Sequence, residues 1–300
     1  MNGLEVNIVG ANPGLWPVPQ IWGWEIALYL FLGGLTAGLM VASGAAFRRS
    51  GDLPRSLGWW APLLAPVVLG AGMLALFFDL ENKLNVWRFY TALRLSSPMS
   101  WGAWILLLVA PATLAMAVVA VQERLVGASP AWRRRIAGAN LGLGIALGIY
   151  TGILLGALGA RPLWNSSMLG PLFLASGVSS ALALLLLLER DAGARHSLNA
   201  VEKKVVGLEA GMLALLLIGL ATGSAAHRAA AKLLLGGEFT GLFWAGVVFA
   251  GMLVPVGLDV LSRKGRAQVS FWPSLLVLAG AFTLRAVILF AGQVSRWEVL

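Results

Sequence analysis

The stretch 22-WGWEIALYLFLGGLTAG-38 sets the expected fold, because it is an apolar run that carries a glutamate close to its start. On a helix, Glu25 and Tyr29 are one turn apart and share a face. Gly34 and Gly38 have the small-xxx-small spacing that lets two helix backbones approach closely. We therefore expect a membrane-crossing helix with one polar face and one face suited to close packing.

The composition indicates an integral membrane protein. The chain has 300 residues, of which 59% are hydrophobic and 12% charged, and its mean hydropathy is +0.83. Apolar runs of about 20 residues recur, and each is long enough to cross a hydrocarbon layer of roughly 30 Å. A backbone in lipid must satisfy its own hydrogen bonds, so we expect an all-α protein with eight transmembrane helices. The expected spans are 22–47, 57–80, 98–123, 136–160, 166–189, 203–225, 239–260 and 269–291.

These spans divide the protein into three expected parts. Residues 1–21 lack the basic region of a cleaved signal peptide and are expected to form a non-cytoplasmic segment. Residues 22–160 and 161–300 are expected to form two four-helix bundles. The runs 31–38 and 173–180 are similar enough to suggest a parallel duplication, although small residues recur at helix contacts without common ancestry.

The distribution of Lys and Arg predicts the orientation. The loops after the first, third, fifth and seventh spans hold fourteen of these residues, and the opposite side holds seven. The positive-inside rule then places both termini on the non-cytoplasmic side. The formal net charge of +9 is explained by this topology, with no need for a nucleic-acid partner. Clusters such as 133-RRR-135 also favour anionic membrane lipid.

The residues that are missing exclude several redox centres. The protein has no cysteine, so it can hold neither an iron–sulfur cluster nor a disulfide. Its two histidines, His196 in an inner loop and His227 near an outer helix end, are not at one depth, as bis-imidazole haem requires. We expect no metal site and no haem. Any electron chemistry must therefore use a diffusible cofactor in the membrane or a redox centre on another subunit.

Polar residues gather on the predicted outer side. Two of the three tyrosines, Tyr29 and Tyr150, lie about 10 and 15 Å below the outer ends of their helices, at a rise of 1.5 Å per residue. Two phenols at similar depth in an apolar surround suit a flat ligand with two carbonyl oxygens, which describes a quinone. Trp and Tyr also anchor membrane proteins at the interface, and this alternative stays open.

Oxidation of a quinol also needs a group that carries each proton to water. Glu25 and Asp79 are the candidates, and Arg88 is close enough in sequence to Asp79 to oppose a rise in its pKa. Two simpler interpretations remain: Glu25 reaches the lipid headgroups, or Asp79 and Arg88 form a structural ion pair.

Ionisable residues also fall within the predicted spans of the second half. They are Glu209, Asp259 and Arg285. Charges inside a membrane are costly and need a partner or water. They are candidates for a proton route from the cytoplasm towards the quinone, and the alternative is an Arg285–carboxylate pair that serves packing.

Three segments resemble the NrfD/polysulfide-reductase membrane-subunit family over nearly the full length. They are 22–38, 79-DLENKLNVWRFY-90 leading into 97-SPMSWGAW-104, and 150-YTGILLGALGARPLWNSS-167. The resemblance implies an eight- or nine-helix anchor in a bacterial or archaeal cytoplasmic membrane that binds menaquinone or ubiquinone near the outer face. The implied partners are a ferredoxin-like four-cluster iron–sulfur subunit and a catalytic, molybdopterin subunit on the non-cytoplasmic side.

The resemblance also implies site residues. The position of a first-helix histidine ligand in the polysulfide-reductase member is Tyr29 here, and a helix-four tyrosine of the family matches Tyr150. The DLGRP-like motif that usually follows the second helix in this family is replaced here by DLENK. Within the resembling segments, Arg88, Trp101, Trp164 and Asn165 are further candidates for quinone contacts.

Two other functions compete with a quinone-reactive anchor. A proton- or ion-coupled secondary transporter would use Glu25, Glu209, Asp259 and Arg285, but such proteins often carry inverted repeats and helices broken in mid-membrane. A purely structural anchor would bind no ligand. Neither the substrate of the catalytic partner nor the direction of electron flow follows from the sequence.

Overall fold

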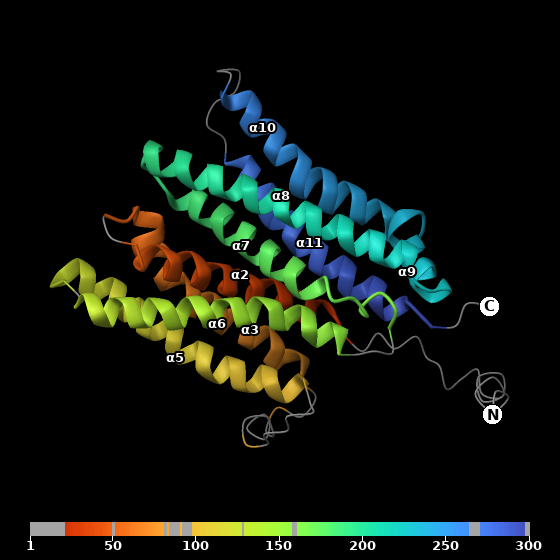
Figure 1. The fold of residues 1–300 in the computed structure, drawn as a ribbon, viewed down its shortest axis with the longest axis horizontal. Helices are drawn as coiled ribbons and strands as arrows, with labels where there is room; N and C mark the ends of the chain where they lie inside the picture. The colour runs from red at the N-terminus through yellow and green to blue at the C-terminus, as the bar shows by residue number, and fades with distance from the viewer. Residues whose placement is uncertain are drawn as a thin grey trace.

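The computed structural model describes residues 22–49, 52–80, 83, 91, 98–127, 129–157, 161–263 and 271–297. These residues form helices and no strand (Figure 1). In chain order the helices are α2 (Trp24–Phe47), the π-helical turns η2 (Ser56–Trp60), α3 (Ala61–Asp79), α5 (Pro98–Leu125), α6 (Pro130–Gly156), α7 (Leu169–Leu188), α8 (Ala192–Thr222), α9 (Ala225–Leu235), the π-helical η4 (Leu242–Leu253), α10 (Val254–Arg263) and α11 (Trp272–Val294).

Seven described helices are long and apolar enough to cross a membrane, counting η2 and α3 as one. The prediction of an all-helical, multi-pass membrane protein is therefore confirmed. Where the seventh span was expected, the apolar helix Leu242–Leu258 is shorter. The count of eight transmembrane helices stays a prediction, and so does the division into two four-helix bundles.

Two helix starts were predicted wrongly. α6 begins at Pro130, six residues before the expected start, and α8 begins at Ala192 instead of residue 203. Each has a side-chain cap: Ser129 Oγ accepts from the backbone N–H of Trp132, and Asp191 accepts from that of Ala194. These caps satisfy N–H groups that have no partner within the helix, so the polar first turns stay helical beyond the apolar core.

The end of α8 and the start of α9 also differ from expectation. The expected span ran to residue 225, whereas α8 ends at Thr222 and α9 begins at Ala225. Gly223 separates the two helices, and Ser224 caps α9 by accepting from the backbone N–H of His227. The short α9 lies near the end of the bundle where α11 ends (Figure 1).

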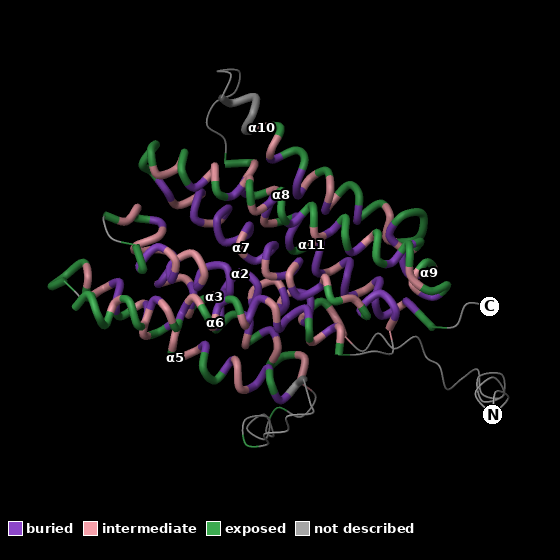
Figure 2. The backbone as a smooth tube through the Cα atoms, viewed as in Figure 1, coloured by how far each residue is buried: buried purple, intermediate pink, exposed green. Residues whose placement is uncertain are grey.

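Helix α2 is the centre of the packing. It contacts α3, α6, α7 and α11, so it joins helices from both halves of the protein. Figure 2 shows buried residues concentrated on α2, α7 and α11 and exposed residues along the outer helices. Gly34 and Gly38 of α2 lie directly against Gly177 of α7, backbone to backbone. The expected close-packing face of α2 is therefore used in the contact with α7.

This contact predicts a large effect for a small substitution. A methyl group at Gly177 would overlap the backbone oxygen of Gly34, which cannot move without shifting a helix. We expect Gly177→Ala to destabilise the protein by about 1–3 kcal/mol, measured by thermal unfolding in detergent. Gly211→Ala on α8 is the control, because nothing lies within 4 Å of the added carbon. Equal melting temperatures for both variants would show that the contact is loose.

A buried glutamate connects two segments at the predicted cytoplasmic end of the bundle. Glu189, 4% exposed, follows α7. Its carboxylate accepts from the backbone N–H groups of Ser56 (3.0 Å), Arg190 (2.9 Å) and Asp191 (3.0 Å). Burial acts to raise the pKa of Glu189, but the hydrogen bonds with Ser56 and the two neighbouring N–H groups outweigh it and lower the pKa. The ionised side chain thus joins η2 to the α7–α8 turn.

The lowered pKa predicts a pH-dependent stability. A carboxyl whose pKa is lower in the folded state stabilises the protein above its unfolded pKa, and this contribution is lost as the pH falls through the folded pKa. We expect Glu189→Gln to cost about 2 kcal/mol at pH 7. The difference from wild type should shrink as the pH falls below the ordinary value of 4.5. Melting temperatures from pH 7 to pH 3.5 measure this, and a constant difference would contradict it.

Candidate functional site

A cavity of about 520 Å³ opens at the end of the bundle where α2 and α5 begin and α3 and α6 end. Its wall is almost entirely apolar. The residues that line it from four helices include Trp22, Ile26, Tyr29, Leu30, Met73, Leu76, Phe77, Asp79, Gly102, Ala103, Leu106, Tyr150, Leu154 and Leu155. The positive-inside distribution predicts that this end is the non-cytoplasmic one.

Two tyrosines from different helices reach this cavity. Tyr29 comes from the second turn of α2 and is 6% exposed, and Tyr150 comes from the penultimate turn of α6 and is 5% exposed. A hydrogen bond joins the Tyr150 hydroxyl to the backbone of Gly102, at the start of α5. A side chain at Gly102 would overlap that hydroxyl, so the glycine makes room for it. The cavity therefore contains two phenols from facing helices.

The rim of the cavity is polar and tied to the second half of the protein. Asp79, half-buried at the end of α3, is the carboxylate among the lining residues. Just before α2, the backbone of Trp22 makes two hydrogen bonds with the side chain of Gln293. The backbone N–H of Trp22 donates to Oε1 at 3.0 Å, and its backbone carbonyl accepts from Nε2 at 3.1 Å. α11 therefore holds the start of α2 in place.

Four residues predicted for the quinone site and its proton relay lie outside the lining. Glu25 is half-buried in the first turn of α2, with its carboxylate folded back over Gly23. Trp101 is 48% exposed in the first turn of α5. Asn165 is exposed and borders a shallow pocket between α6 and α7. The fourth, Trp164, is described next.

Trp164 is part of the framework behind the cavity. It is 3% exposed, and its indole N–H donates to the carbonyl of Ile288 in α11 at 2.9 Å. Its ring lies 5.5 Å from that of Trp22, centre to centre. Trp164 therefore supports a lining residue without being one. Arg88 lies outside the described residues, and the side chain of Asp259 does as well.

Glu209 and Arg285 form a second polar cluster, deep between α7, α8 and α11. The guanidinium of Arg285, 0% exposed, donates to Ser176 Oγ (2.9 Å) and to the carbonyls of Ala281 (3.0 Å) and Phe173 (3.1 Å). Glu209 accepts from Ser179 Oγ at 2.7 Å and also bonds with Ser176. Ser176 thus bridges the two charged groups.

Aromatic rings complete the surroundings of Arg285. Its guanidinium carbon lies 6.0 Å from the centre of Phe31 and 5.3 Å from that of Phe173. These two phenylalanines occupy the first positions of the similar runs 31–38 and 173–180. Ring faces attract a cation, so both runs help to hold the buried charge.

Sequence reasoning missed several residues that shape these sites. Ser176 and Ser179 lie three apart on α7, a spacing that signals one polar helix face. Ile26 and Leu30 flank Tyr29 at helical spacing and line the cavity with it. Gly102 gave no usable signal, because its role depends on a tyrosine 48 positions away in another helix.

The architecture defines a class: a polytopic helical membrane protein with an apolar, tyrosine-containing cavity at one end. Within that class, the protein belongs to the NrfD family, because the family profile "Polysulphide reductase, NrfD" matches residues 17–295. The polysulfide reductase C subunit of Wolinella succinogenes is 33% identical to it over 91% of this sequence and 94% of that protein.

Two further relatives carry the family name. The NrfD protein of Escherichia coli K12 is 30% identical over 92% of this sequence and 96% of its own length. A homologue in Haemophilus influenzae is 28% identical over 93% and 98%. The resemblance found in the sequence is therefore confirmed. Membership in this family indicates a membrane subunit of a redox complex.

Proposed function

We propose that the protein is the membrane anchor of a respiratory oxidoreductase complex and that its cavity binds a quinone, menaquinone or ubiquinone. The observation that carries this proposal is the convergence of Tyr29, Tyr150 and Asp79 on one otherwise apolar cavity. A structural anchor has no need of such a cavity. The family relatives support a redox role over transport.

The residues of the cavity fit a quinone ring. Its volume of about 520 Å³ lies within the roughly 300–1,000 Å³ that is usual for small-molecule sites. Aliphatic and aromatic walls suit the ring and its hydrocarbon tail, and each tyrosine hydroxyl can hydrogen-bond a carbonyl oxygen. When bound, the quinone supplies reversible two-electron, two-proton chemistry.

The side chains then have separate tasks. Tyr29 and Tyr150 orient the ring, and Tyr150 is itself positioned by Gly102. Asp79, at the rim, exchanges protons between the cavity and the outer aqueous phase. Glu25, in the first turn of α2, lies at the same end of the bundle as Asp79 and extends this proton relay to water. Trp101 in the first turn of α5, Trp164 behind Trp22, and the exposed Asn165 complete the described part of the proposed site. Arg88, which lies outside the described residues, is proposed as a further contact.

The absence of cysteine in the sequence supports the proposal of a redox partner. A quinone-reactive subunit without its own metal centre needs a neighbouring redox protein, which we propose is a ferredoxin-like four-cluster iron–sulfur subunit on the non-cytoplasmic side. That subunit would pass electrons to or from a catalytic molybdopterin subunit. The name of the Wolinella relative, which designates one lettered component of a polysulfide reductase, supports a multi-subunit enzyme.

We further propose that Glu209, Asp259 and Arg285 belong to a proton route from the cytoplasm. The cluster of Glu209, Ser176 and Arg285 supports it, because hydroxyls and charged groups in hydrogen-bonding contact can relay protons. The alternative is a pair that serves packing. Proton uptake from each side of proteoliposomes tests the route. Unchanged stoichiometry in the combined Glu209→Gln, Asp259→Asn and Arg285→Met variant would eliminate it.

Filling the cavity tests quinone binding directly. Ala103 is 8% exposed and lines the cavity, so Ala103→Phe would occupy part of the space for the ring. We expect the quinone extracted from the purified complex to fall about tenfold. Leu114→Phe on the same helix is the control, because Leu114 is 57% exposed on the outer surface. Full quinone content in Ala103→Phe with intact assembly would contradict the site.

A further inference from the structure

The arginine-rich end of the bundle, opposite the quinone cavity, carries a second pocket. Its volume is about 460 Å³, and the end of α2, η2, the last turns of α5 and the first turn of α6 enclose it. The charged side chains that line it are Asp52, Arg55, Glu123, Arg124 and Arg133. Three cations and two carboxylates leave the lining with an excess of positive charge.

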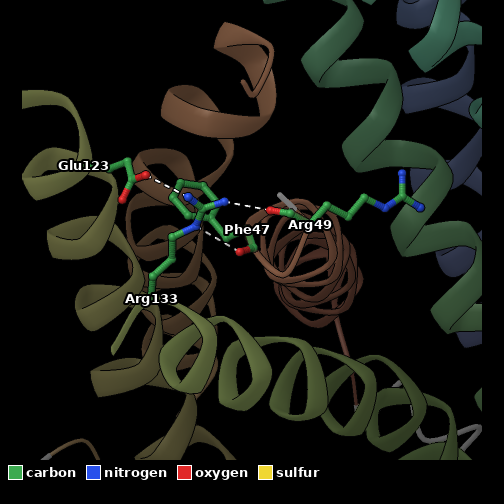
Figure 3. A network of polar contacts seen from close by, with 4 residues as sticks. All are labelled: Phe47, Arg49, Glu123 and Arg133. Carbon is green, nitrogen blue, oxygen red and sulfur yellow. Dashed lines mark hydrogen bonds and ion pairs between the residues drawn. The ribbon is translucent and has the colours of Figure 1, made fainter. Parts of the chain in front are cut away.

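Arg133 forms the fixed back of this pocket (Figure 3). Its Nε donates to the carbonyl of Phe47 at 3.1 Å, Nη1 to Glu123 Oε1 at 2.8 Å, and Nη2 to the carbonyl of Arg49 at 2.7 Å. Its guanidinium also lies 5.7 Å from the centre of the Phe47 ring. These contacts join α2, α5 and α6, and the charge of Arg133 is balanced by Glu123. Arg133 therefore shapes the pocket.

The other two arginines are held differently. The guanidinium carbon of Arg124 lies 4.8 Å from the centre of the Trp59 ring, and that of Arg55 lies 5.9 Å from the Trp60 ring. Both arginines are exposed. A ring face orients a cation but leaves its charge and its N–H groups able to bind an anion. With Arg133 paired to Glu123, Arg55 and Arg124 outnumber the one remaining carboxylate, Asp52, and carry the excess positive charge of the pocket.

Exposed apolar side chains lie further along two of the helices that meet at the pocket. α3 follows directly from η2, and its Val67 is 65% exposed. On α5, which ends at the pocket, Val118 is 52% exposed. Such exposed aliphatic faces on membrane-crossing helices meet lipid chains. A molecule with a phosphate head and acyl tails can therefore fill the pocket and cover these faces together, which a free anion cannot do.

We propose that this pocket binds the phosphate of an anionic phospholipid, with Arg55 and Arg124 as the phosphate ligands. The acyl chains lie along the outer faces of α3 and α5. Asp52 at the rim accepts hydrogen bonds from hydroxyls of the headgroup. Two arginines on different helices share one phosphate, so the lipid links η2 to α5 at the membrane surface.

The test measures lipid binding to the full-length protein in neutral detergent by native mass spectrometry, with phosphatidylglycerol as the probe. We expect Arg55→Gln/Arg124→Gln to weaken binding of the first lipid about tenfold. Arg134→Gln/Arg135→Gln is the matched control. It removes the same charge from two exposed residues next to Arg133 that do not line the pocket, and it should change binding less than about twofold. Equal weakening in both double variants would overturn the proposal.

Two further ligands test the wild-type protein, so the result does not depend on how the variants fold. Diacylglycerol keeps the acyl chains without the phosphate, and glycerophosphate keeps the phosphate without the chains. We expect each to bind about tenfold more weakly than phosphatidylglycerol, because each loses one of the two recognised parts. Equal binding of diacylglycerol would show that the arginines are not used. Equal binding of glycerophosphate would show that the pocket takes a free anion and would exclude a lipid site.

Discussion

Replacing Tyr29 and Tyr150 by phenylalanine is expected to lower quinol-linked electron flow about 10- to 100-fold for each residue. Each substitution removes one hydroxyl and leaves the ring, so the cavity keeps its shape. The loss follows from a missing hydrogen bond to an oxygen that gains charge as electrons move, which is worth roughly 1.5–3 kcal/mol. Steady-state electron transfer from a quinol to the complete complex in membranes measures it.

The control for these variants is Thr151→Val. Thr151 follows Tyr150 in the sequence and is buried, and its hydroxyl donates to the carbonyl of Gly148 at 2.8 Å within the same helix. It is not a cavity residue. Thr151→Val should keep normal turnover, so loss of activity in the tyrosine variants would not reflect general damage to α6. Normal turnover in both Tyr29→Phe and Tyr150→Phe would show that the quinone binds elsewhere.

The second large effect concerns the buried charges. Glu209→Gln removes the carboxylate that shares Ser176 with the guanidinium of Arg285. Loss of one partner of a buried charged pair costs roughly 3–5 kcal/mol, so we expect a strong fall in stability. Arg285→Met should be equally damaging, because it removes the positive charge next to the carboxylate of Glu209. Unfolding of the purified protein in detergent measures both.

The double variant separates an energetic pair from two unrelated residues. Glu209→Gln/Arg285→Met removes both charges, so it should be more stable than either single variant. If the two costs simply add, Ser176 does not couple the two groups, and the proposed cluster is wrong. Proton stoichiometry adds information, since a packing pair predicts a normal value in a stable double variant and a proton route predicts its loss.

The sequence alone predicted the helical membrane fold because a backbone in lipid must satisfy its own hydrogen bonds, as a helix does. The ends of the helices were less predictable, because hydropathy indicates which residues contact lipid, and a helix can extend beyond them. Polar caps at Ser129 and Asp191 extend α6 and α8 past their apolar cores. η4 is π-helical and runs directly into α10, and no hydropathy pattern distinguishes its π-helical turns from a regular α-helix.

The candidate site was predictable in part. Depth along the helices predicted that Tyr29 and Tyr150 could share a cavity, and both line the same one. Depth along a helix does not give the position of a residue in a turn between helices, so it did not predict that Trp164, between α6 and α7, packs on α11 behind the cavity. Depth also does not give the rotation of a helix about its axis, so it did not predict that Ser176 bridges Glu209 and Arg285, which come from helices far apart in sequence.

Photolabelling of the intact complex in membranes with an azidoquinone, followed by mass spectrometry of the labelled peptides, shows where the quinone binds. We expect labels on α2, α3, α5 and α6 at residues that line the cavity, in the regions of Tyr29, Phe77, Ala103 and Tyr150, and loss of these labels when excess quinone competes. Competed labels found only on α8, η4 or α11 would contradict quinone binding in this cavity.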